Sequence, residues 1–230
     1  MNICFMTISE YTTKAMNDAT YRIDFFADGV YYCMEIIDEQ EVAGTMNETL
    51  KTIAERYSCR DFADTPLTDE QVKAIAEAAL AAPSARNAMP WQVIVVTDKA
   101  LITDLDNEGV RILTTGDDKL GYGARLREEG GTLFYNAPCM VMLAKDASAY
   151  AVNDCGIVSQ NVTLAAHSLG LGSVIVGLAG VPFGGPRGEE FEKLFKFPEG
   201  YSFGIAVLVG TPKSGKAPHE LDMDKVTYIR

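Results

Sequence analysis

The sequence predicts an α+β protein in which helices pack around a buried sheet. Helical and strand-like segments alternate irregularly after residue 46, without the regular strand–helix repeat of a doubly wound parallel sheet. The chain has 230 residues, of which 47% are hydrophobic and 23% are charged. This composition suits one domain with a sizeable core, or such a domain with an appendage.

The overall charge and the cysteine pattern argue against several classes of protein. A net charge of −12 offers no general attraction to nucleic acids or anionic membranes, so an anionic ligand must be held by a few placed Lys and Arg residues. The five cysteines include no C-x-x-C pair, and only two histidines accompany them, so we expect no metal site. With no signal peptide or membrane span expected, reduced thiols in the cytoplasm are the simplest interpretation.

Residues 1–45 differ from the rest of the chain and carry no recognisable chemistry. They contain a strand-like patch at 29–34 and an acidic run at 38–41. Two interpretations compete: an extra hairpin packed on the domain, or sequence upstream of a natural start at Met46. We favour the second, and treat 1–45 as an N-terminal extension of unknown role and 46–230 as the domain.

Two helices are expected at the start of this domain. The first carries Leu50, Ile53 and Ala54. The second begins with a capping box, in which the side chains of Thr68 and Gln71 satisfy free amides at the helix start, and it ends before Pro83. Its apolar positions recur at helical spacing and predict one buried face. These positions are Val72, Ile75, Ala76, Ala79 and Leu80.

The remaining elements follow from apolar runs and glycine breaks. Strands are expected at 91–97, 137–144, 173–176 and 201–209. The first two are apolar almost throughout, which predicts burial on both faces. Residues 154–169 form an expected central helix that is apolar on most sides and ends at Gly170. A short helix is expected at 188–197. The polar, glycine-punctuated stretch at 98–131 predicts short helices over an active site.

Two glycine-rich segments resemble nucleotide-binding loops. Residues 170–177 (GLGSVIVG) leave a helix and enter a strand, whereas a dinucleotide fingerprint runs from strand to helix. Residues 210–216 (GTPKSGK) match the P-loop pattern, but Ala217 stands where the hydroxyl that holds magnesium is needed. A P-loop nucleotide binder is therefore the less favoured alternative. Lys213 and Lys216 can still contact a phosphate.

Two further motifs carry a family resemblance. Residues 56–62 (RYSCRDF) set two arginines four apart with a serine between them, a pattern that can bind phosphate. Residues 82–91 (APSARNAMPW) join the capped helix to a strand. Together with 134–138, the central helix and its exit at 159–173, and the ending from Gly210, these motifs resemble the nitroreductase family. The resemblance covers 46–230.

The resemblance implies a three-layer α-β-α sandwich with a central, mostly antiparallel sheet, in an intertwined homodimer with FMN at the subunit interface. Arg56, Ser58 and Lys216 then contact the phosphate and ribityl chain, while Arg60 lies near the pyrimidine edge and tunes the flavin. The other expected cofactor contacts are Tyr57 and Lys213, Pro83, Ser84 and Asn87 toward the flavin of the other subunit, and Val176 and Gly177 along the isoalloxazine ring.

The implied function is ping-pong transfer of hydride from NADPH or NADH through FMN to a small acceptor such as a nitroaromatic or quinone. The flavin supplies the chemistry, so no catalytic side chain is expected. We interpret His167 as a packed core residue, and Cys59 as a neighbour of the phosphate site whose pKa two arginines could lower. An FMN-binding carrier without turnover is an alternative. Dehalogenation, flavin cleavage, azoline oxidation and the choice of nicotinamide donor all stay open.

Overall fold

The structure is a computed structural model that describes residues 21–27, 30–36, 47–115, 121–129, 131–217 and 219–230. Its contacts divide the chain into two compact units, Met1–Lys51 and Thr52–Arg230. Helix α3 (Glu48–Glu55) spans the division, and none of its residues is buried.

The described part of the first unit is a β-hairpin. β1 (Tyr21–Ala27) pairs antiparallel with β2 (Val30–Ile36), with Tyr21 opposite Ile36 and Ala27 opposite Val30. The strand expected at 29–34 is therefore present from Val30 onward, and residue 29 lies outside the described residues. The acidic run at 38–41 also lies outside them. A two-stranded hairpin is marginally stable alone in water, so this unit needs additional contacts to persist.

The second unit is built on a four-stranded antiparallel sheet with the strand order β3-β4-β6-β5. Its strands are β3 (Trp91–Val96), β4 (Cys139–Lys145), β5 (Gly172–Val176) and β6 (Ser202–Gly210). The middle strand β4 is buried almost throughout, and β6 is buried in its second half. The expectation that the strand at 91–97 is buried on both faces was wrong: β3 is an edge strand, Gln92 is exposed, and three of its residues are only half-buried.

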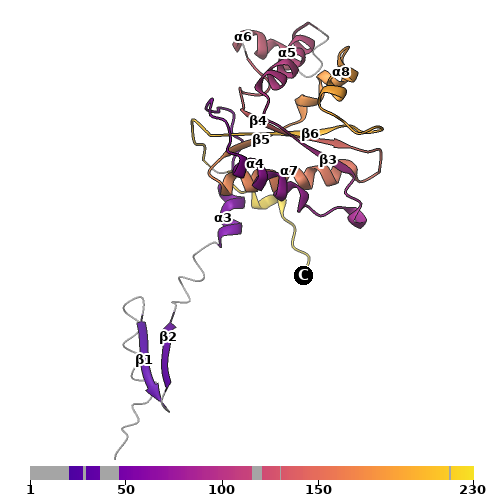
Figure 1. Ribbon diagram of the computed structural model, residues 1–230. Helices are drawn as coiled ribbons and strands as arrows, with labels where there is room; N and C mark the ends of the chain where they lie inside the picture. The colour runs from indigo at the N-terminus through magenta and orange to yellow at the C-terminus, as the bar shows by residue number, and fades with distance from the viewer. Residues whose placement is uncertain (1–20, 28–29, 37–46, 116–120, 130, 218) are drawn as a thin grey trace, which may run out of the picture. The chain divides into compact units, whose positions relative to one another are not determined.

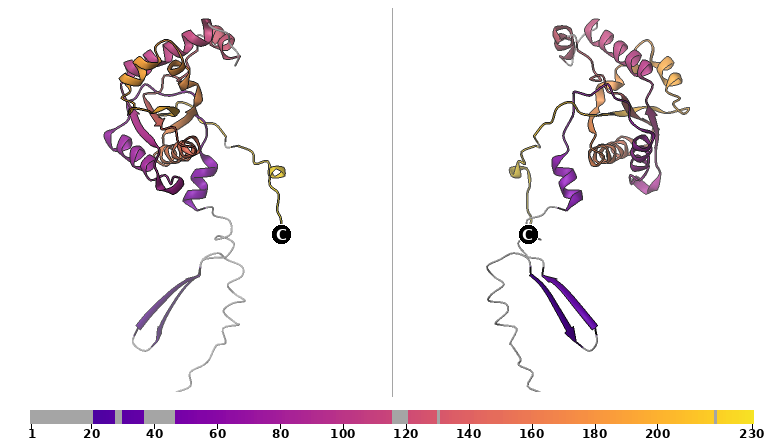
Figure 2. Two further views of the ribbon diagram at one scale, coloured as in Figure 1. Left: turned by 90° about the vertical axis from the view of Figure 1, so that its right-hand side faces the viewer. Right: turned by 60° about the vertical axis from the view of Figure 1, so that its left-hand side comes forward.

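Helices cover both faces of this sheet (Figures 1 and 2). α4 (Asp69–Leu80) and α7 (Ala151–Ser168) pack on one face, while α5 (Lys99–Thr115) and α8 (Gly188–Leu194) pack on the other. α6 (Tyr122–Glu129) packs against α5. A hydrophobic core lies on each face of the sheet, and alternate residues of β4 belong to one or the other. Met140 and Met142 point to the α5 side, and Val141 and Leu143 to the α4–α7 side. The three-layer α+β expectation is confirmed.

The helix ends follow the local sequence. In α4 the Gln71 amide donates to Thr68 Oγ1 at 3.2 Å and the Thr68 amide donates to Gln71 Oε1 at 2.9 Å, which is the expected capping box. Leu80, however, is 60% exposed, so it does not belong to the buried face. α7 ends in a Schellman motif: Gly170 has a φ of 73°, and the Leu171 amide donates to the Ala166 carbonyl.

The polar stretch at 98–131 contains a longer helix than expected. α5 runs for 17 residues because Asp98 caps its first turn, accepting from the amides of Ala100 and Leu101, and because its apolar residues face the sheet. Its acidic residues have partners: Asp104 pairs with Arg187, and the buried Glu108 with Arg111. Because these charged side chains have partners, α5 is longer than its polar composition predicted.

The short helices η1 (Ala85–Asn87), η2 (Gly177–Gly180), η3 (Pro182–Gly184) and η4 (Met223–Lys225) complete the described elements. The two central ones follow the C-terminal end of β5, and η1 lies in the connection between α4 and β3. No helix in the described part of the chain is long and apolar enough to cross a membrane.

Candidate functional site

The segment from Arg56 to Ala63 runs between β5 and the residues that follow β6. Ser58 forms a parallel bridge with Ser173, and the Cys59 amide donates to the Ser173 carbonyl at 2.9 Å. On the other side Phe62 bridges Pro212. The first arginine–serine motif and the start of the basic tail are thus joined through backbone hydrogen bonds, although some 150 residues separate them in the sequence.

Three more hydrogen bonds complete this junction, which consists of residues 56–63, the start of β5 and residues 211–214. The Ala63 amide donates to the Thr211 carbonyl at 2.8 Å, and the Lys213 amide donates to the Asp61 carbonyl at 3.0 Å. The Tyr57 hydroxyl donates to the Ser214 carbonyl at 2.9 Å. The structure therefore brings Tyr57 and Lys213 to one place, as the resemblance requires.

The cations of this junction differ in how they are engaged. Lys213 Nζ lies 3.5 Å from an Asp61 carboxylate oxygen, so part of its charge is neutralised within the chain. Arg60 and Lys216 are exposed, with no ion pair among the described residues. Arg56 is half-buried, and its Nε is a buried donor without a hydrogen-bond partner in the described part of the chain. Because a buried guanidinium donor is costly to leave unsatisfied, the Arg56 Nε is available to donate to water or to a bound anion.

Cys59 sits inside the junction, and its environment contradicts the idea that arginines lower its pKa. Only 2% of the residue is exposed, and burial raises the pKa of the thiol. The thiol sulfur lies 3.4 Å from the Asp61 carbonyl oxygen. Cys59 is consequently a packed thiol, held in its neutral form at neutral pH.

The turn at 83–89 has an unusual backbone. Arg86, Asn87 and Met89 have φ values of 56°, 54° and 45°, in the left-handed region that non-glycine residues rarely adopt. Ser84 Oγ accepts a hydrogen bond from the Met89 amide at 2.9 Å, which closes the turn. Pro83 and Asn87 are exposed. Among the described residues, no hydrogen bond or ion pair joins this turn to 56–60.

β5 connects the junction to the expected ring contacts. Its first residues lie against Ser58 and Cys59, and its last residue, Val176, is followed by the exposed Gly177 at the start of η2. At about 3.3 Å per residue, the strand spans roughly 13 Å. Val176 is buried, whereas Ile175 is 38% exposed and Gly177 is exposed, so the accessible groups at this end of the strand are the Ile175 side chain and the backbone of Gly177.

The structure contradicts one further expectation and excludes the P-loop alternative. The match at 210–216 does not form a P-loop, because β6 has antiparallel neighbours and the only described helix after it is the three-residue η4. His167 is not a core residue: it is half-buried in the last turn of α7, with Nε2 lying 3.9 Å from a Glu55 carboxylate oxygen.

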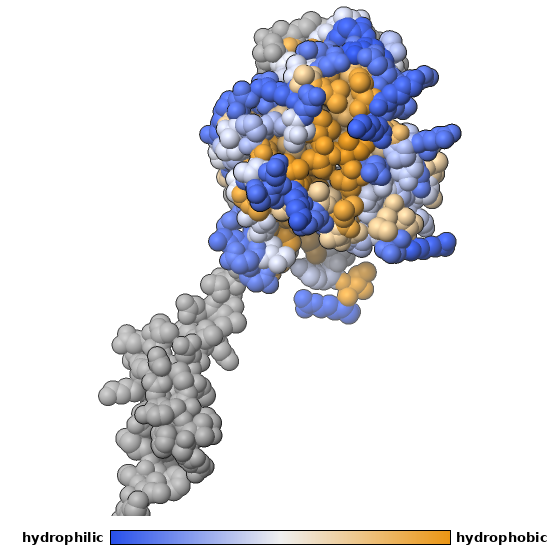
Figure 3. Space-filling view, in the orientation of Figure 1, coloured by the Kyte–Doolittle hydropathy of each residue, from blue (hydrophilic) through white to orange (hydrophobic). Residues whose placement is uncertain are grey.

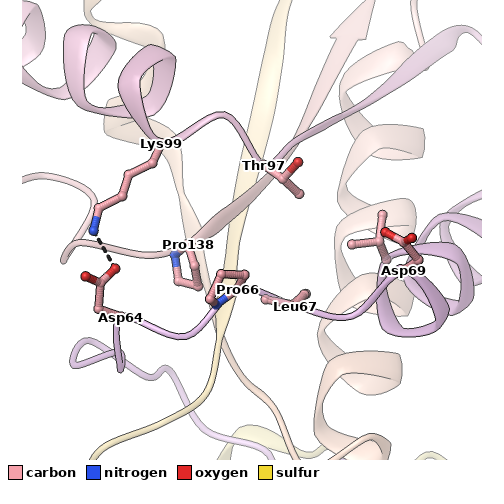
Figure 4. A pocket seen from close by; sticks show the side chains of 8 residues that line it. Asp64, Pro66, Leu67, Asp69, Thr97, Lys99 and Pro138 are labelled. Carbon is pink, nitrogen blue, oxygen red and sulfur yellow. Dashed lines mark hydrogen bonds and ion pairs between the residues drawn. The ribbon is translucent and has the colours of Figure 1, made fainter.

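A cavity of about 270 Å³ lies elsewhere, beside the end of β3 (Figure 4). None of the predicted site residues lines it. Lys99 and Asp64 point toward each other there and form an ion pair, and Lys99 holds the pKa of the Asp64 carboxyl below its ordinary value. The third charged residue of the lining, Asp69, is an acid, so the cavity offers no unpaired cation for an anionic ligand. The described residues also contain no His, Cys, Asp or Glu cluster that could hold a metal ion.

The comparisons with known proteins identify the family. The model of the nitroreductase family matches residues 53–211, so the chain belongs to this family. A solved nitroreductase with bound FMN from Desulfitobacterium hafniense is 48% identical, with a TM-score of 0.76 over 81% of this chain and 100% of that one. An FMN-dependent nitroreductase from Clostridium difficile is 27% identical, with a TM-score of 0.67 over 80% and 99%.

One relative of this chain is named for its activity. An FMN reductase [NAD(P)H] from Bacillus subtilis is 30% identical over 202 residues, which cover 80% of this chain and 76% of that protein. The predicted family and fold are thereby confirmed, and the predicted cofactor agrees with the FMN bound in the first of the two solved structures and required by the second protein.

Two site residues escaped the sequence interpretation. Gly172 was considered as part of the glycine-rich segment 170–177, but a side chain there would collide with the junction: a Cβ would lie 2.8 Å from both Cβ and Sγ of Cys59 and 3.2 Å from Pro212 Cβ. Asp154 was given no role, yet it is buried and contacts the turn at 83–89. The available signal was an acidic residue in a helix that is otherwise largely apolar.

The close approach at Gly172 predicts a loss of stability in Gly172→Ala. The added methyl group must displace the buried Cys59 side chain or Pro212, and such overpacking costs about 1–3 kcal/mol. Gly184→Ala is the matched control, because a Cβ at Gly184 meets no atom within 4 Å, and its free energy of unfolding should stay within about 0.5 kcal/mol of the original. Urea unfolding of the three proteins measures both values. Equal stability of the two variants would contradict the tight packing.

Proposed function

We propose that this protein is an FMN-dependent oxidoreductase that takes hydride from NADPH or NADH and reduces a small acceptor such as a nitroaromatic or quinone. The observation that carries the proposal is the junction around Arg56, where a buried guanidinium donor has no hydrogen-bond partner in the described part of the chain and lies beside a serine and the start of a basic tail. Family membership and the named relatives support the same class of activity.

The residues at the junction fit the phosphate end of FMN. Arginine can bind phosphate oxygens through two parallel hydrogen bonds, and a serine hydroxyl adds another donor. In a chain with a net charge of −12, local cations are needed to hold an anion at all. Arg56 and Ser58 would hold the phosphate and ribityl chain, with Lys216 and the partly neutralised Lys213 adding positive charge.

The remaining contacts follow β5 and the strained turn. Val176 and Gly177 would lie along the isoalloxazine ring, where backbone groups can donate to the flavin, and Arg60 would stabilise negative charge near its pyrimidine edge. When bound, FMN supplies the acceptance of hydride from the nicotinamide and its transfer to the second substrate in a ping-pong cycle. The chain itself contributes orientation and charge.

We place each FMN at the interface of a homodimer, with Pro83, Ser84 and Asn87 supplied by the other subunit. Two observations support this arrangement. The turn at 83–89 makes no hydrogen bond to 56–60 within its own chain, and large apolar side chains are exposed on the second unit, including Leu80, Val152 and Ile157 at 60%, 64% and 40%. Figure 3 shows apolar residues gathered across the middle of one face of this unit. Such a surface is typical of a protein–protein interface.

The visible spectrum of the purified protein tests the function directly. We expect flavin absorption bands that bleach on anaerobic addition of NADPH or NADH and return when a quinone or nitroaromatic is added. The nucleotide that bleaches faster identifies the preferred donor. Bands that persist with both nucleotides would indicate an FMN carrier without turnover. Absence of flavin after incubation with FMN would refute the proposal.

Arg56→Ala should lose FMN while the protein stays folded. Removing a charge-assisted hydrogen bond to the phosphate is expected to weaken FMN binding roughly 10- to 100-fold. Lys73→Ala is the control, because it removes one positive charge from the exposed surface of α4. Titration of the flavin-free proteins with FMN, followed by flavin fluorescence, gives the two dissociation constants. Unchanged affinity in Arg56→Ala would remove the phosphate assignment.

Mixed dimers test whether the turn acts on the other subunit. The mixed dimer contains one Arg56→Ala chain and one Asn87→Ala chain. If the turn contacts the flavin bound by the other subunit, both defects fall in one site and the second site stays intact. A turn acting within its own chain leaves both sites damaged. Co-expression with two different affinity tags isolates the mixed dimer. We expect one tightly bound FMN per mixed dimer, and binding no tighter than in either parent would contradict the shared site.

A further inference from the structure

Asp154 is a buried carboxylate that the proposed function does not use. It lies near the start of α7, and only 4% of it is exposed. Both of its carboxylate oxygens lie 3.3 Å from the backbone amide of Ala85, which is 69 residues away in the sequence. Ala85 is the first residue of η1, in the middle of the turn at 83–89.

The carboxylate of Asp154 faces the turn at 83–89. No cation pairs with it among the residues that the structure describes, and the Ala85 amide is its described hydrogen-bond donor. A buried carboxylate needs hydrogen bonds to offset its lost hydration, so the Ala85 amide is held toward it.

The turn needs such an external contact. Arg86, Asn87 and Met89 have positive φ values, and such strained backbone persists only where its surroundings determine it. The hydrogen bond between Ser84 and Met89 closes the turn from within. The contact between Asp154 and Ala85 instead attaches the turn to α7, whose buried residues pack against the sheet.

We infer that Asp154 is a positioning residue for FMN binding: through the Ala85 amide it fixes the turn at 83–89 so that Pro83, Ser84 and Asn87 meet the flavin. This inference rests on the proposed function. Asp154 itself acts only through Ala85, so its loss displaces the turn without removing any group that binds the flavin.

The first test measures the turn in the absence of flavin. Hydrogen exchange of the full-length, flavin-free protein reports on the amides of 82–89. Asp154→Ala should speed exchange in this segment. Ser159→Ala is the matched control: Ser159 is equally buried on the same helix, but its hydroxyl donates to the Cys155 carbonyl within α7. It should leave the exchange of the turn unchanged. Unaltered exchange in Asp154→Ala would overturn the inference, whether or not the protein binds FMN.

The second test measures FMN affinity in the same proteins by fluorescence titration. Asp154→Ala should bind FMN roughly 10- to 100-fold more weakly, the range expected for losing a hydrogen bond to a charged group. Asp154→Asn keeps the size and one acceptor oxygen, so it should fall between the original protein and the alanine variant. Ser159→Ala should keep the original affinity.

The outcomes separate this inference from the proposed function. Strong FMN binding by the original protein and unchanged binding by folded Asp154→Ala would leave the function intact and overturn the positioning role. If Asp154→Ala does not fold, Asp154→Leu decides, because leucine is similar in size and offers no acceptor to the Ala85 amide; unchanged affinity in that variant has the same meaning. Equal weakening in Asp154→Ala and Ser159→Ala would show a merely structural effect. Absence of FMN binding by the original protein would overturn the proposed function, and the inference with it.

Discussion

The candidate site depends on the backbone hydrogen bonds that hold Arg56–Ala63 between β5 and the residues after β6. This segment belongs to no named helix or strand, yet the amides of Cys59 and Ala63 donate to the carbonyls of Ser173 and Thr211, and the Asp61 carbonyl accepts from Lys213. Since backbone groups are strong hydrogen-bonding groups, these bonds determine the path of the segment on both sides. Along this path the Arg56 Nε is buried and has no hydrogen-bond partner among the described residues.

The antiparallel sheet makes this junction possible. Because β6 runs antiparallel to β5, the end of β6 at Gly210 lies opposite the beginning of β5 at Gly172. The arginine motif can therefore contact both segments at one edge of the sheet. The small size of Gly172 lets Cys59 and Pro212 approach the strand. The same strand then leads from the junction to Gly177, so one element spans the two ends of the proposed flavin site.

Local patterns predicted much of the fold, because the interactions behind them are local. The capping box at Thr68, the stop at Gly170 and the apolar run of β4 all depend on residues a few positions apart. The sequence patterns gave wrong predictions where the structure depends on partners far away in the sequence. The polar composition of α5 concealed a long helix whose charges are paired, and the apolar run of β3 did not show that it forms the edge of the sheet.

The sequence by itself determined the family, the antiparallel α+β architecture and the residue types that can bind a phosphate, because motif order, hydrophobic periodicity and side-chain chemistry are properties of the chain. Only the tertiary structure decided which of these residues meet. It joined Tyr57 to Ser214, kept the Cys59 thiol neutral by burial, and attached Ala85 to Asp154. Such contacts depend on how elements pack over long sequence separations, and no local pattern encodes them.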